Sequence, residues 1–467
     1  MLPRDQAVQV VRTLRAHGHQ AYLVGGCVRD LLLGREPSDY DVATDAIPER
    51  VMRIFPRTWA MGAQFGVVLV PAEESSRDEW EEPGAQPSRI SQGGAGVEIS
   101  HARKPIEVAT FRSDGLYTDG RHPREVRYTS RPEEDVQRRD FTINGLLLDP
   151  LDHDRVLDFV GGQRDLEAGI IRTIGDPHQR FQEDRLRLLR AVRFAARFGY
   201  TIEPSTFAAI RELAPLLDSV SRERVRDELT KMLTEGRARD AFELLDRTGL
   251  LQQLLPEVEK MKGVEQPPQF HPEGDVWVHT LLLIGMLPPR VSPTLGWGAL
   301  LHDVGKPPTF RVAPDRIRFD GHVEVGEAMA RDICQRLRMS KDDTEQIVAL
   351  IAHHMRFADA TRMKQSTLRR FMRLPHFAEH LELHRMDCLA GPGDLTAYHY
   401  VRDQYERTPE EQIRPAPLLT GHDLIALGMS PGPAFRDILS AVEDAQLEGL
   451  LQSKEQALEF VRRRSAR

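Results

Sequence analysis

Two aspartates close together in the chain have the spacing expected of a metal site. Asp39 and Asp41 lie two positions apart in the β-like run SDYDVAT, so a strand there would place both carboxylates on one face. Neighbouring carboxylate oxygens suit Mg²⁺ that also binds substrate phosphates, and two such ions can activate an attacking hydroxyl and stabilise a leaving pyrophosphate. Glu107, in the β-like run IEVATF, is the candidate third carboxylate. Taken alone, these residues could also be exposed acids at strand ends.

A pair of glycines precedes these acids. In AYLVGGCVRDLLLG, Gly25 and Gly26 follow an apolar strand-like run and precede a helix-like one. Glycines there let backbone N–H groups approach phosphates, and the start of the helix adds a favourable dipole. Arg29, one turn into the helix, could bind the same phosphates with its guanidinium. A plain tight turn is the alternative, but the acids that follow favour a site for a triphosphate and Mg²⁺.

A later segment, 183–198, has the residues needed to choose a base. Asp184, Arg187 and Arg190 would share one face of a helix over this segment. Arginine only donates and ionised aspartate only accepts hydrogen bonds. Cytosine and adenine each present a ring-nitrogen acceptor beside an amino donor, whereas uracil and guanine present the opposite pattern. An Arg–Asp pair therefore matches C and A and leaves buried groups unpaired with U and G; a solvated helix face is the alternative.

Histidines and aspartates concentrate between residues 271 and 387. An adjacent His-Asp pair ends an apolar stretch in GALLHDVGKP, with one histidine before it and one aspartate far beyond it; His322 and His353-His354 also occur here. Such a mixed nitrogen and oxygen set suits Mn²⁺, Fe²⁺, Ni²⁺ or Mg²⁺. The candidate ligands of this second metal site are His279, His302, Asp303 and Asp387.

The elements around these residues change in character along the chain. Short strand-like and helical runs alternate in the first part, which predicts an α+β fold, and helical periodicity dominates after about residue 150. The acidic and then Gly/Ser/Pro-rich stretch 72–97 reads as a surface insertion without a function of its own. The expected division is a head at 1–150, a helical neck and body at 151–260, a metal-hydrolase-like domain at 261–395 and a helical tail at 396–467.

The composition limits the class of protein. The chain has 467 residues, a formal net charge of −8 and 40% hydrophobic residues, which is ordinary for a multi-domain protein and does not announce a nucleic-acid partner. No apolar run reaches the roughly 20 residues of a membrane span, and the N-terminal run reads as an amphipathic helix, not a signal peptide. Three distant cysteines fit a reducing compartment, so we expect a cytoplasmic protein without a membrane partner. Its oligomeric state is not predicted.

Several motifs occur together in a familiar order over about 210 residues. They are GGCVRD with DYD, RRDFTINGLLLD at 138–149, LDFVGGQRDLEAGIIR at 157–172, EDRLRLLRAVRF at 183–194 and SRERVRDELTKML. The first pair resembles the signature of polymerase-β-like nucleotidyltransferases, and the set resembles the CCA-adding and poly(A) polymerase branch. The resemblance implies a nucleotidyltransferase head with a mixed sheet, then an all-helical neck, body, HD domain and tail.

The same resemblance implies an activity and roles for residues. It implies template-independent addition of C, C and A to tRNA 3′ ends from CTP and ATP, with Mg²⁺ as cofactor and pyrophosphate as product. Base selection would fall to Asp184, Arg187 and Arg190. The nucleotide contacts that it implies within RRDFTIN are Arg138, Arg139, Asp140 and Asn144.

The segment 112–127 narrows the choice within the branch. RSDGLYTDGRHPREVR, with Arg112, Asp119 and Arg121, resembles the flexible loop of family members that add the terminal A, which disfavours an enzyme that adds only CC. The stretch 62–65 is Gly-Ala-Gln-Phe, where bacterial poly(A) polymerases tend to be basic, and this favours CCA addition. An A-only enzyme and a poly(A) polymerase stay open as alternatives.

The second metal site resembles that of HD phosphohydrolases, whose helical fold holds one or two metals. Some CCA-adding enzymes carry such a domain with phosphatase and 2′,3′-cyclic phosphodiesterase activity, and the ligand set here is complete. The alternative is a helical body that holds RNA without hydrolysis. For the whole chain, the competing hypotheses are a hydrolase whose head only binds nucleotide, and an RNA-binding scaffold with both sites vestigial.

Overall fold

The computed structural model describes residues 2–59, 66–71, 104–114, 126–269 and 271–465. Its internal contacts divide the chain into a first unit, 1–220, and a second unit, 221–467. Each unit is described by itself. Within the described ranges, every helix is too short or too polar to cross a membrane.

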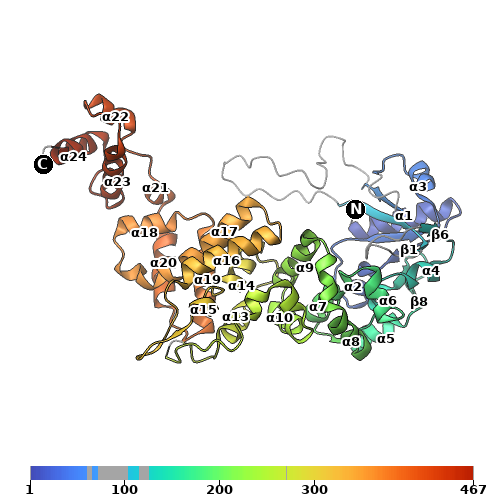
Figure 1. The fold of residues 1–467 in the computed structure, drawn as a ribbon. Coiled ribbons are helices and arrows are strands. Elements are labelled where there is room, and N and C mark those ends of the chain that lie inside the picture. Colours follow the sequence, from blue (N-terminus) through green and yellow to red (C-terminus); the bar gives the residue numbers. More distant parts are fainter. Residues whose placement is uncertain (1, 60–65, 72–103, 115–125, 270, 466–467) are drawn as a thin grey trace. The chain divides into compact units, whose positions relative to one another are not determined.

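A six-stranded mixed sheet forms the centre of the first unit (Figure 1). β2 and β4 run parallel, whereas the other neighbouring strands pair antiparallel. A separate antiparallel pair joins β5 (Arg112–Asp114) to β6 (Val126–Tyr128). In sheet order the six strands are β3 (Val67–Val70), β4 (Ile106–Thr110), β2 (Asp41–Thr44), β1 (Ala21–Val24), β7 (Leu146–Asp149) and β8 (Arg155–Asp158).

Helices surround this sheet because their apolar faces bury against it. In α1 (Pro3–Ala16), Val11 and Leu14 are fully buried and the helix packs on β1, as the predicted amphipathic pattern requires. The pair β9 (Ile170–Ile171) and β10 (Thr201–Ile202) is parallel. The other helical elements of the first unit are α2 (Gly26–Leu32), α3 (Pro48–Ile54), α4 (Pro132–Gln137), η2 (Thr142–Asn144), α5 (Gly162–Ala168), α6 (Pro177–Glu183), α7 (Arg187–Phe198), α8 (Pro204–Leu213) and η3 (Ala214–Ser219).

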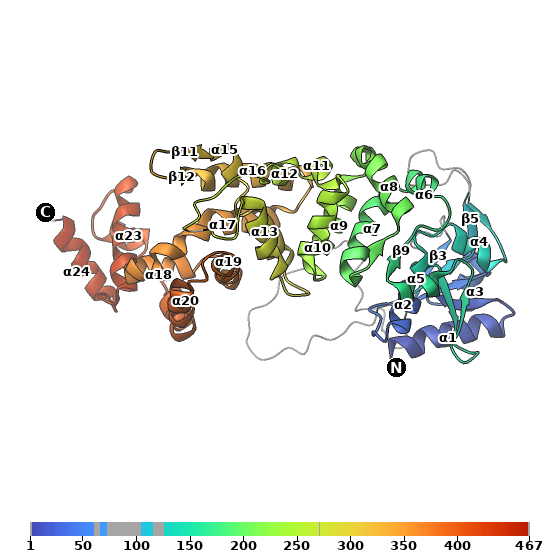
Figure 2. The same ribbon diagram turned by 90° about the horizontal axis from the view of Figure 1, so that it is seen from below.

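The second unit is almost entirely helical, and α13, α14, α16, α17 and α19 pack against one another within it (Figure 2). Its only described strands are the short hairpin β11 (Arg311–Val312) and β12 (Ile317–Arg318). A small separate core joins α22, α23 and α24 near the C-terminus. The helices are α9 (Arg222–Thr234), α10 (Ala238–Arg247), α11 (Leu250–Leu254), α12 (Pro256–Glu259), α13 (Val276–Gly285), α14 (Pro293–Leu301), α15 (Lys306–Thr309), α16 (His322–Arg336), α17 (Lys341–His353), η4 (His354–Arg362), α18 (Gln365–Met372), α19 (Phe377–Ala390), α20 (Thr396–Arg407), α21 (Glu410–Ile413), α22 (Gly421–Ala426), α23 (Pro433–Leu447) and α24 (Lys454–Ser465).

The observed elements correct three local expectations. β2 begins at Asp41, so Asp39 precedes the strand and the shared-face argument does not apply to it. The helix expected over 183–198 is broken, because Asp184 has extended backbone between α6 and α7. Strand β8 follows residue 150 and pairs with β7 in the head sheet, so the chain beyond that residue is not purely helical. The proposed division into four domains stays a prediction.

Candidate functional site

Three carboxylates gather at the edge of β2 and β4 in the first unit. Asp41 pairs directly with Glu107 in the parallel register, so both side chains lie on the same face of neighbouring strands. Burial, together with the negative charges of Glu107 and Asp39, raises the pKa of Asp41 to about 7. Burial and Asp39 also raise the pKa of Glu107. The three predicted catalytic acids are therefore electrostatically coupled, and Asp41 is only partly ionised near neutral pH.

These acids fit a divalent cation. Like charges at close range cannot all ionise unless a cation offsets them, and hard carboxylate oxygens are the ligands that Mg²⁺ prefers. Arg139 is a neighbouring positive charge that opposes the shift at Asp41. Asp39, Asp41 and Glu107 are thus the residues of this unit that would hold Mg²⁺.

The predicted glycine turn lies next to the guanidinium of Arg139. Gly25, between β1 and α2, has φ 77° and ψ −128°, a backbone conformation that residues other than glycine rarely adopt. A Cβ added at Gly25 would lie 3.4 Å from Arg139 Nη1. The turn, Arg139 and Asp41 therefore border one region, as a nucleoside triphosphate with its metal requires.

Arg29 has a different environment from the one expected. Its side chain is only 4% exposed, with Nη1 donating to Asn144 Oδ1 over 2.7 Å and Nε to Asp30 Oδ1 over 2.9 Å. The guanidinium also lies 4.6 Å from the ring centre of Phe198. Arg29 links α2 to η2 and α7, and a direct contact with phosphate stays a prediction.

The motif RRDFTIN connects the sheet to helix α7. Asp140 Oδ2 accepts from Arg190 Nη2 over 2.6 Å, and Asp140 Oδ1 accepts from Asn144 Nδ2 over 3.1 Å. Although burial opposes ionisation, Arg190 and Arg187 lower the pKa of Asp140 to about 2. Arg138 and Arg139 both donate to Asp135, a buried residue that the sequence interpretation did not single out.

The predicted base-selecting residues follow the break between α6 and α7. Asp184 Oδ1 accepts from the Leu186 amide over 3.1 Å, so its side chain binds the backbone just before α7 begins. Arg187 donates from Nη1 to Glu183 Oε2 over 2.8 Å and from Nη2 to the Arg138 carbonyl over 2.9 Å. These contacts attach Arg187 to the motif RRDFTIN. Glu183, quoted within a motif but given no role, is one of its anchors.

Part of the predicted loop lies outside the described residues. Arg112 begins β5 and pairs with Tyr128 of β6, so the stem of the loop is present. Asp119 and Arg121, the stretch 62–65 and the insertion 72–97 fall outside the described ranges. Their expected roles stay predictions.

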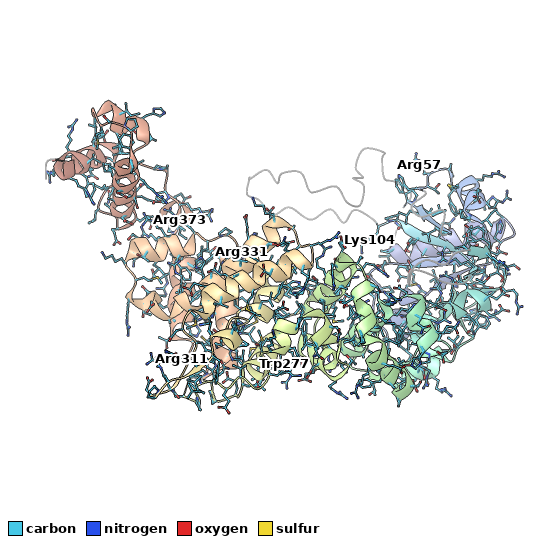
Figure 3. The ribbon with its side chains drawn as sticks, in the orientation of Figure 1. Arg57, Lys104, Trp277, Arg311, Arg331 and Arg373 are labelled. Carbon is cyan, nitrogen blue, oxygen red and sulfur yellow. The ribbon has the colours of Figure 1, made fainter. Side chains whose placement is uncertain are left out.

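The second unit brings the four predicted HD ligands together. Helix α13, which carries the buried Trp277 labelled in Figure 3, also carries His279. His279 Nε2 lies 3.0 Å from Asp387 Oδ1, and His302 Nε2 lies 3.9 Å from the same oxygen. The carboxylate of Asp303 is 3.2 Å from His302 Nε2. His279 comes from α13 and Asp387 from α19, whereas His302 and Asp303 directly follow the end of α14.

Two further histidines complete a second group around Asp303. His354 Nε2 and His322 Nε2 lie 3.8 Å and 4.0 Å from Asp303 Oδ1. Together with Asp303 they form a potential metal-binding trio beside the trio of His279, His302 and Asp387. The sequence interpretation noted both histidines without placing them among the ligands. His353 instead lies 5.9 Å from the ring centre of His380.

The ring orientation of these histidines fits metal binding. Nδ1 donates to a backbone carbonyl in His302, His322 and His354, at 2.7–2.9 Å. Because a carbonyl can only accept, Nδ1 carries a hydrogen, and in the neutral imidazole that binds a metal the lone pair therefore lies on Nε2. The three Nε2 atoms and Asp303 Oδ1 are buried without a hydrogen-bond partner, which is costly in a protein interior unless a ligand engages them.

A carboxylate orients the fourth histidine. Glu273 Oε1 lies 2.6 Å from His279 Nδ1 and 2.9 Å from His271 Nδ1. Despite burial, the hydrogen bonds to Asp387 and Glu273 raise the pKa of His279 to about 9. His302 and Lys306 hold the pKa of Asp303 well below its usual range although burial opposes this. The sequence interpretation missed Glu273, whose place six residues before His279 was the available signal.

Three known protein families match successive parts of the chain. The family described as the poly A polymerase head domain matches residues 21–172, and the probable RNA and SrmB-binding site of polymerase A matches residues 199–262. The HD domain matches residues 280–389. The mixed sheet and this match thus place residues 21–172 in the class of poly A polymerase head domains.

The relatives narrow this class. The chain is 41% identical to the CCA-adding enzyme of Geobacillus thermodenitrificans over 248 residues, 53% of this chain and 54% of that protein. It is 35% identical to the CCA-adding enzyme of Bacillus licheniformis over 298 residues, 62% of this chain and 67% of that protein. The alignment with the Geobacillus protein thus spans just over half of that relative's length.

A solved structure extends the likeness to nearly the whole chain. The crystal structure of the Bacillus stearothermophilus CCA-adding enzyme in complex with CTP has a TM-score of 0.72 and 25% identity, covering 100% of this chain and 99% of that chain. The chain belongs to the family of bacterial CCA-adding enzymes.

Proposed function

We propose that the protein is a CCA-adding tRNA nucleotidyltransferase that uses CTP and ATP and releases pyrophosphate. The observation that carries this proposal is the Asp41–Glu107 register, which joins two of the head acids beside Arg139 and the Gly25 turn. The partners would be tRNA 3′ ends, so we expect the protein to act in the cytoplasm. The Geobacillus and Bacillus relatives carry the same name.

In this proposal the head residues bind the triphosphate and the attacking hydroxyl. Asp39, Asp41 and Glu107 hold Mg²⁺, which when bound favours ionisation of the RNA 3′-hydroxyl and offsets charge on the leaving pyrophosphate. Gly25 and Gly26 let the backbone approach the phosphates. Arg139 adds positive charge beside this turn.

The segment between α6 and α7 would select the base. Asp184 accepts from the amino group of cytosine or adenine, and Arg187 donates to the ring nitrogen. Because Glu183 and the Arg138 carbonyl fix Arg187, the arginine cannot turn away to accommodate uracil or guanine without losing these contacts. Arg190 holds Asp140, and through Asp140 also Asn144, near the ribose.

The experiment offers purified protein and Mg²⁺ three tRNA transcripts, ending at the discriminator base, after CC, or complete. Each receives CTP, ATP or both, and products are sized to one nucleotide. We expect CCA on the shortest transcript and a stop there. A single A added only to the CC-ended transcript would identify an A-adding enzyme. Long A tails would identify a poly(A) polymerase, and no extension by either nucleotide would refute the proposal.

A second activity is favoured by the buried, unpaired Nε2 atoms in the second unit. We propose a metal-dependent phosphohydrolase there, acting on phosphomonoesters or 2′,3′-cyclic phosphates. His279, His302, Asp303, Asp387, His322 and His354 would hold one or two divalent ions. A bound ion supplies Lewis acidity toward a phosphate oxygen. Hydrolysis of 2′,3′-cyclic AMP and p-nitrophenyl phosphate with Ni²⁺, Mn²⁺, Fe²⁺ or Mg²⁺ tests this and identifies the metal; no turnover with any of them refutes it.

A further inference from the structure

One buried carboxylate holds both arginines of the motif RRDFTIN. Asp135 is 1% exposed and belongs to α4. Its Oδ1 accepts from Arg138 Nε at 3.0 Å and Nη2 at 2.7 Å, and its Oδ2 accepts from Arg139 Nε at 3.2 Å and Nη2 at 2.9 Å. Each arginine thus donates from Nε and Nη2 to a single carboxylate oxygen of Asp135. A two-donor contact fixes the plane of a guanidinium as well as its position.

A backbone contact from another element fixes the carboxylate itself. The amide of Arg112 donates to Asp135 Oδ1 over 3.3 Å, and β5, which begins at Arg112, packs against α4. The preceding residue, Phe111, is fully buried and belongs to the core of the head. Asp135 is therefore held by the sheet-side backbone on one side and by two cations on the other.

The cluster of Asp135, Arg138 and Arg139 has the positive charge that would attract a triphosphate. Two arginines share a single negative charge, so this cluster carries a net positive charge. Arg139 places positive charge beside the proposed nucleotide site, since its Nη1 approaches Gly25 and its charge acts on Asp41. Burial opposes ionisation of Asp135, but Arg139 and Arg138 lower its pKa, so it stays an acceptor for both.

We propose that Asp135 is a positioning residue for nucleotide binding, one that acts only by holding Arg138 and Arg139 in the orientation the triphosphate and ribose require. This inference rests on the proposed nucleotidyltransferase function. Long arginine side chains have many rotamers, and a group fixed in a productive geometry before the substrate binds costs less to use. No contact with substrate is assigned to Asp135.

The test is Asp135→Asn, which keeps the shape of the side chain and removes its charge. We expect KM for both CTP and ATP to rise about tenfold while kcat changes less than about threefold. The matched control is Asp149→Asn, because Asp149 is also buried and ion-paired, with Arg15 at 2.7 Å, but at the end of β7 away from the Gly25 turn. We expect the control to lower thermal stability and leave both KM values unchanged.

A double-variant cycle separates positioning from general damage. If Asp135 acts only through Arg138 and Arg139, then adding Asp135→Asn to the Arg138→Ala/Arg139→Ala variant should raise KM no more than about twofold beyond that variant alone. Independent, multiplying effects would overturn the proposal. If Asp135→Asn does not fold, it is replaced by Asp135→Asn/Arg138→Gln, which removes one half-buried cation together with the buried anion. The same KM increase is expected.

The wild-type reaction distinguishes the two proposals. If the wild-type protein extends no transcript with CTP or ATP, the nucleotidyltransferase function itself fails. If the wild type extends RNA and Asp135→Asn shows unchanged KM values for both nucleotides, the function stands and the positioning role of Asp135 is refuted.

Discussion

The carboxylates of the head and those of the HD site differ in how their charge is compensated. In the head, Asp41 faces Glu107 and Asp39, and burial and these charges raise its pKa to about 7. In the HD site, His302 and Lys306 keep the pKa of Asp303 well below its usual range. One site is rich in uncompensated negative charge, whereas the other holds ionised acids among basic groups.

This difference leads to different expectations for how each site binds its metal. The head acids gain most from a cation that arrives with the nucleotide, because binding replaces a proton held between like charges. The HD ligands are buried, and His302, His322 and His354 present Nε2 without a metal having to turn them. We therefore expect the head to exchange Mg²⁺ readily and the HD site to retain its ion. The predictions below test this contrast.

The largest expected effect is the loss of one activity without the other. Asp39→Ala/Asp41→Ala should lower nucleotide addition by at least about 10³-fold, because both metal-holding carboxylates are removed. His302→Ala/Asp303→Ala should abolish phosphohydrolase turnover in the same assay series. Each variant is the control for the other, measured by RNA extension and by p-nitrophenyl phosphate hydrolysis. Loss of both activities in either variant would contradict the separation of the sites.

Removing the orienting carboxylate of His279 should weaken only the HD site. Glu273→Gln is expected to reduce the affinity of this site for Mn²⁺ or Ni²⁺ about 10- to 100-fold, since the carboxylate fixes the ring that binds the metal. Metal titration followed by calorimetry measures this. Glu265→Gln, an exposed glutamate eight residues before, serves as the control and should bind normally. An unchanged metal affinity in Glu273→Gln would show that Glu273 does not orient His279 for metal binding.

The two sites should also respond differently to pH. Below pH 7 a proton competes for Asp41, so the apparent Mg²⁺ affinity of the head should fall about tenfold per pH unit and level off above pH 7. At the HD site the competing proton belongs to His279, whose pKa is raised to about 9, so metal affinity should continue to rise up to that pH. Mg²⁺ dependence of extension and Mn²⁺ titration of the hydrolase, each from pH 5.5 to 9.5, measure the two profiles. Identical profiles would contradict the comparison.

The smallest expected effect is on stability. The folded pKa of Asp41 lies above its unfolded value of 3.8, so folding takes up a proton between about pH 4 and 7 and stability falls as pH rises through that window. Asp41→Asn removes this cost and should raise Tm by about 2–4 °C at pH 8 without Mg²⁺. The gain should vanish at pH 4, where Asp41 is protonated in the folded wild type. Differential scanning calorimetry at both pH values decides this, and a lower Tm at pH 8 would contradict it.

Much of the architecture could be predicted from the sequence because strand and helix periods reflect burial directly. The mixed-sheet head, the helical remainder and the HD domain were confirmed. The exact ends of helices and strands near the site were harder to predict. Asp184 satisfies the Leu186 amide with its own side chain, which breaks the expected helix. Asp39 precedes β2 because pairing with β4 begins only at Asp41.

Residues that act through other residues were missed for a physical reason. Asp135 has Arg138 and Arg139 three and four positions beyond it, a pattern shared by countless exposed helix pairs, and only burial distinguishes it. His322 and His354 meet Asp303 from α16 and η4, so tertiary packing, not spacing, identifies them. The roles of all these residues, like those of the predicted site residues, stay predictions for the experiments above.

The pairing of Val70 with Ile106 has a consequence for how the gene can vary in length. These residues are register partners on either side of the segment 71–105, so insertions or deletions confined to that segment leave every pair between β3 and β4 unchanged. A single codon added inside β4, between Glu107 and Val108, would instead move Glu107 one position along the strand and turn its side chain to the face opposite that of Asp41. Length variation among descendants of this chain should therefore accumulate on one side of Ile106 and be eliminated on the other.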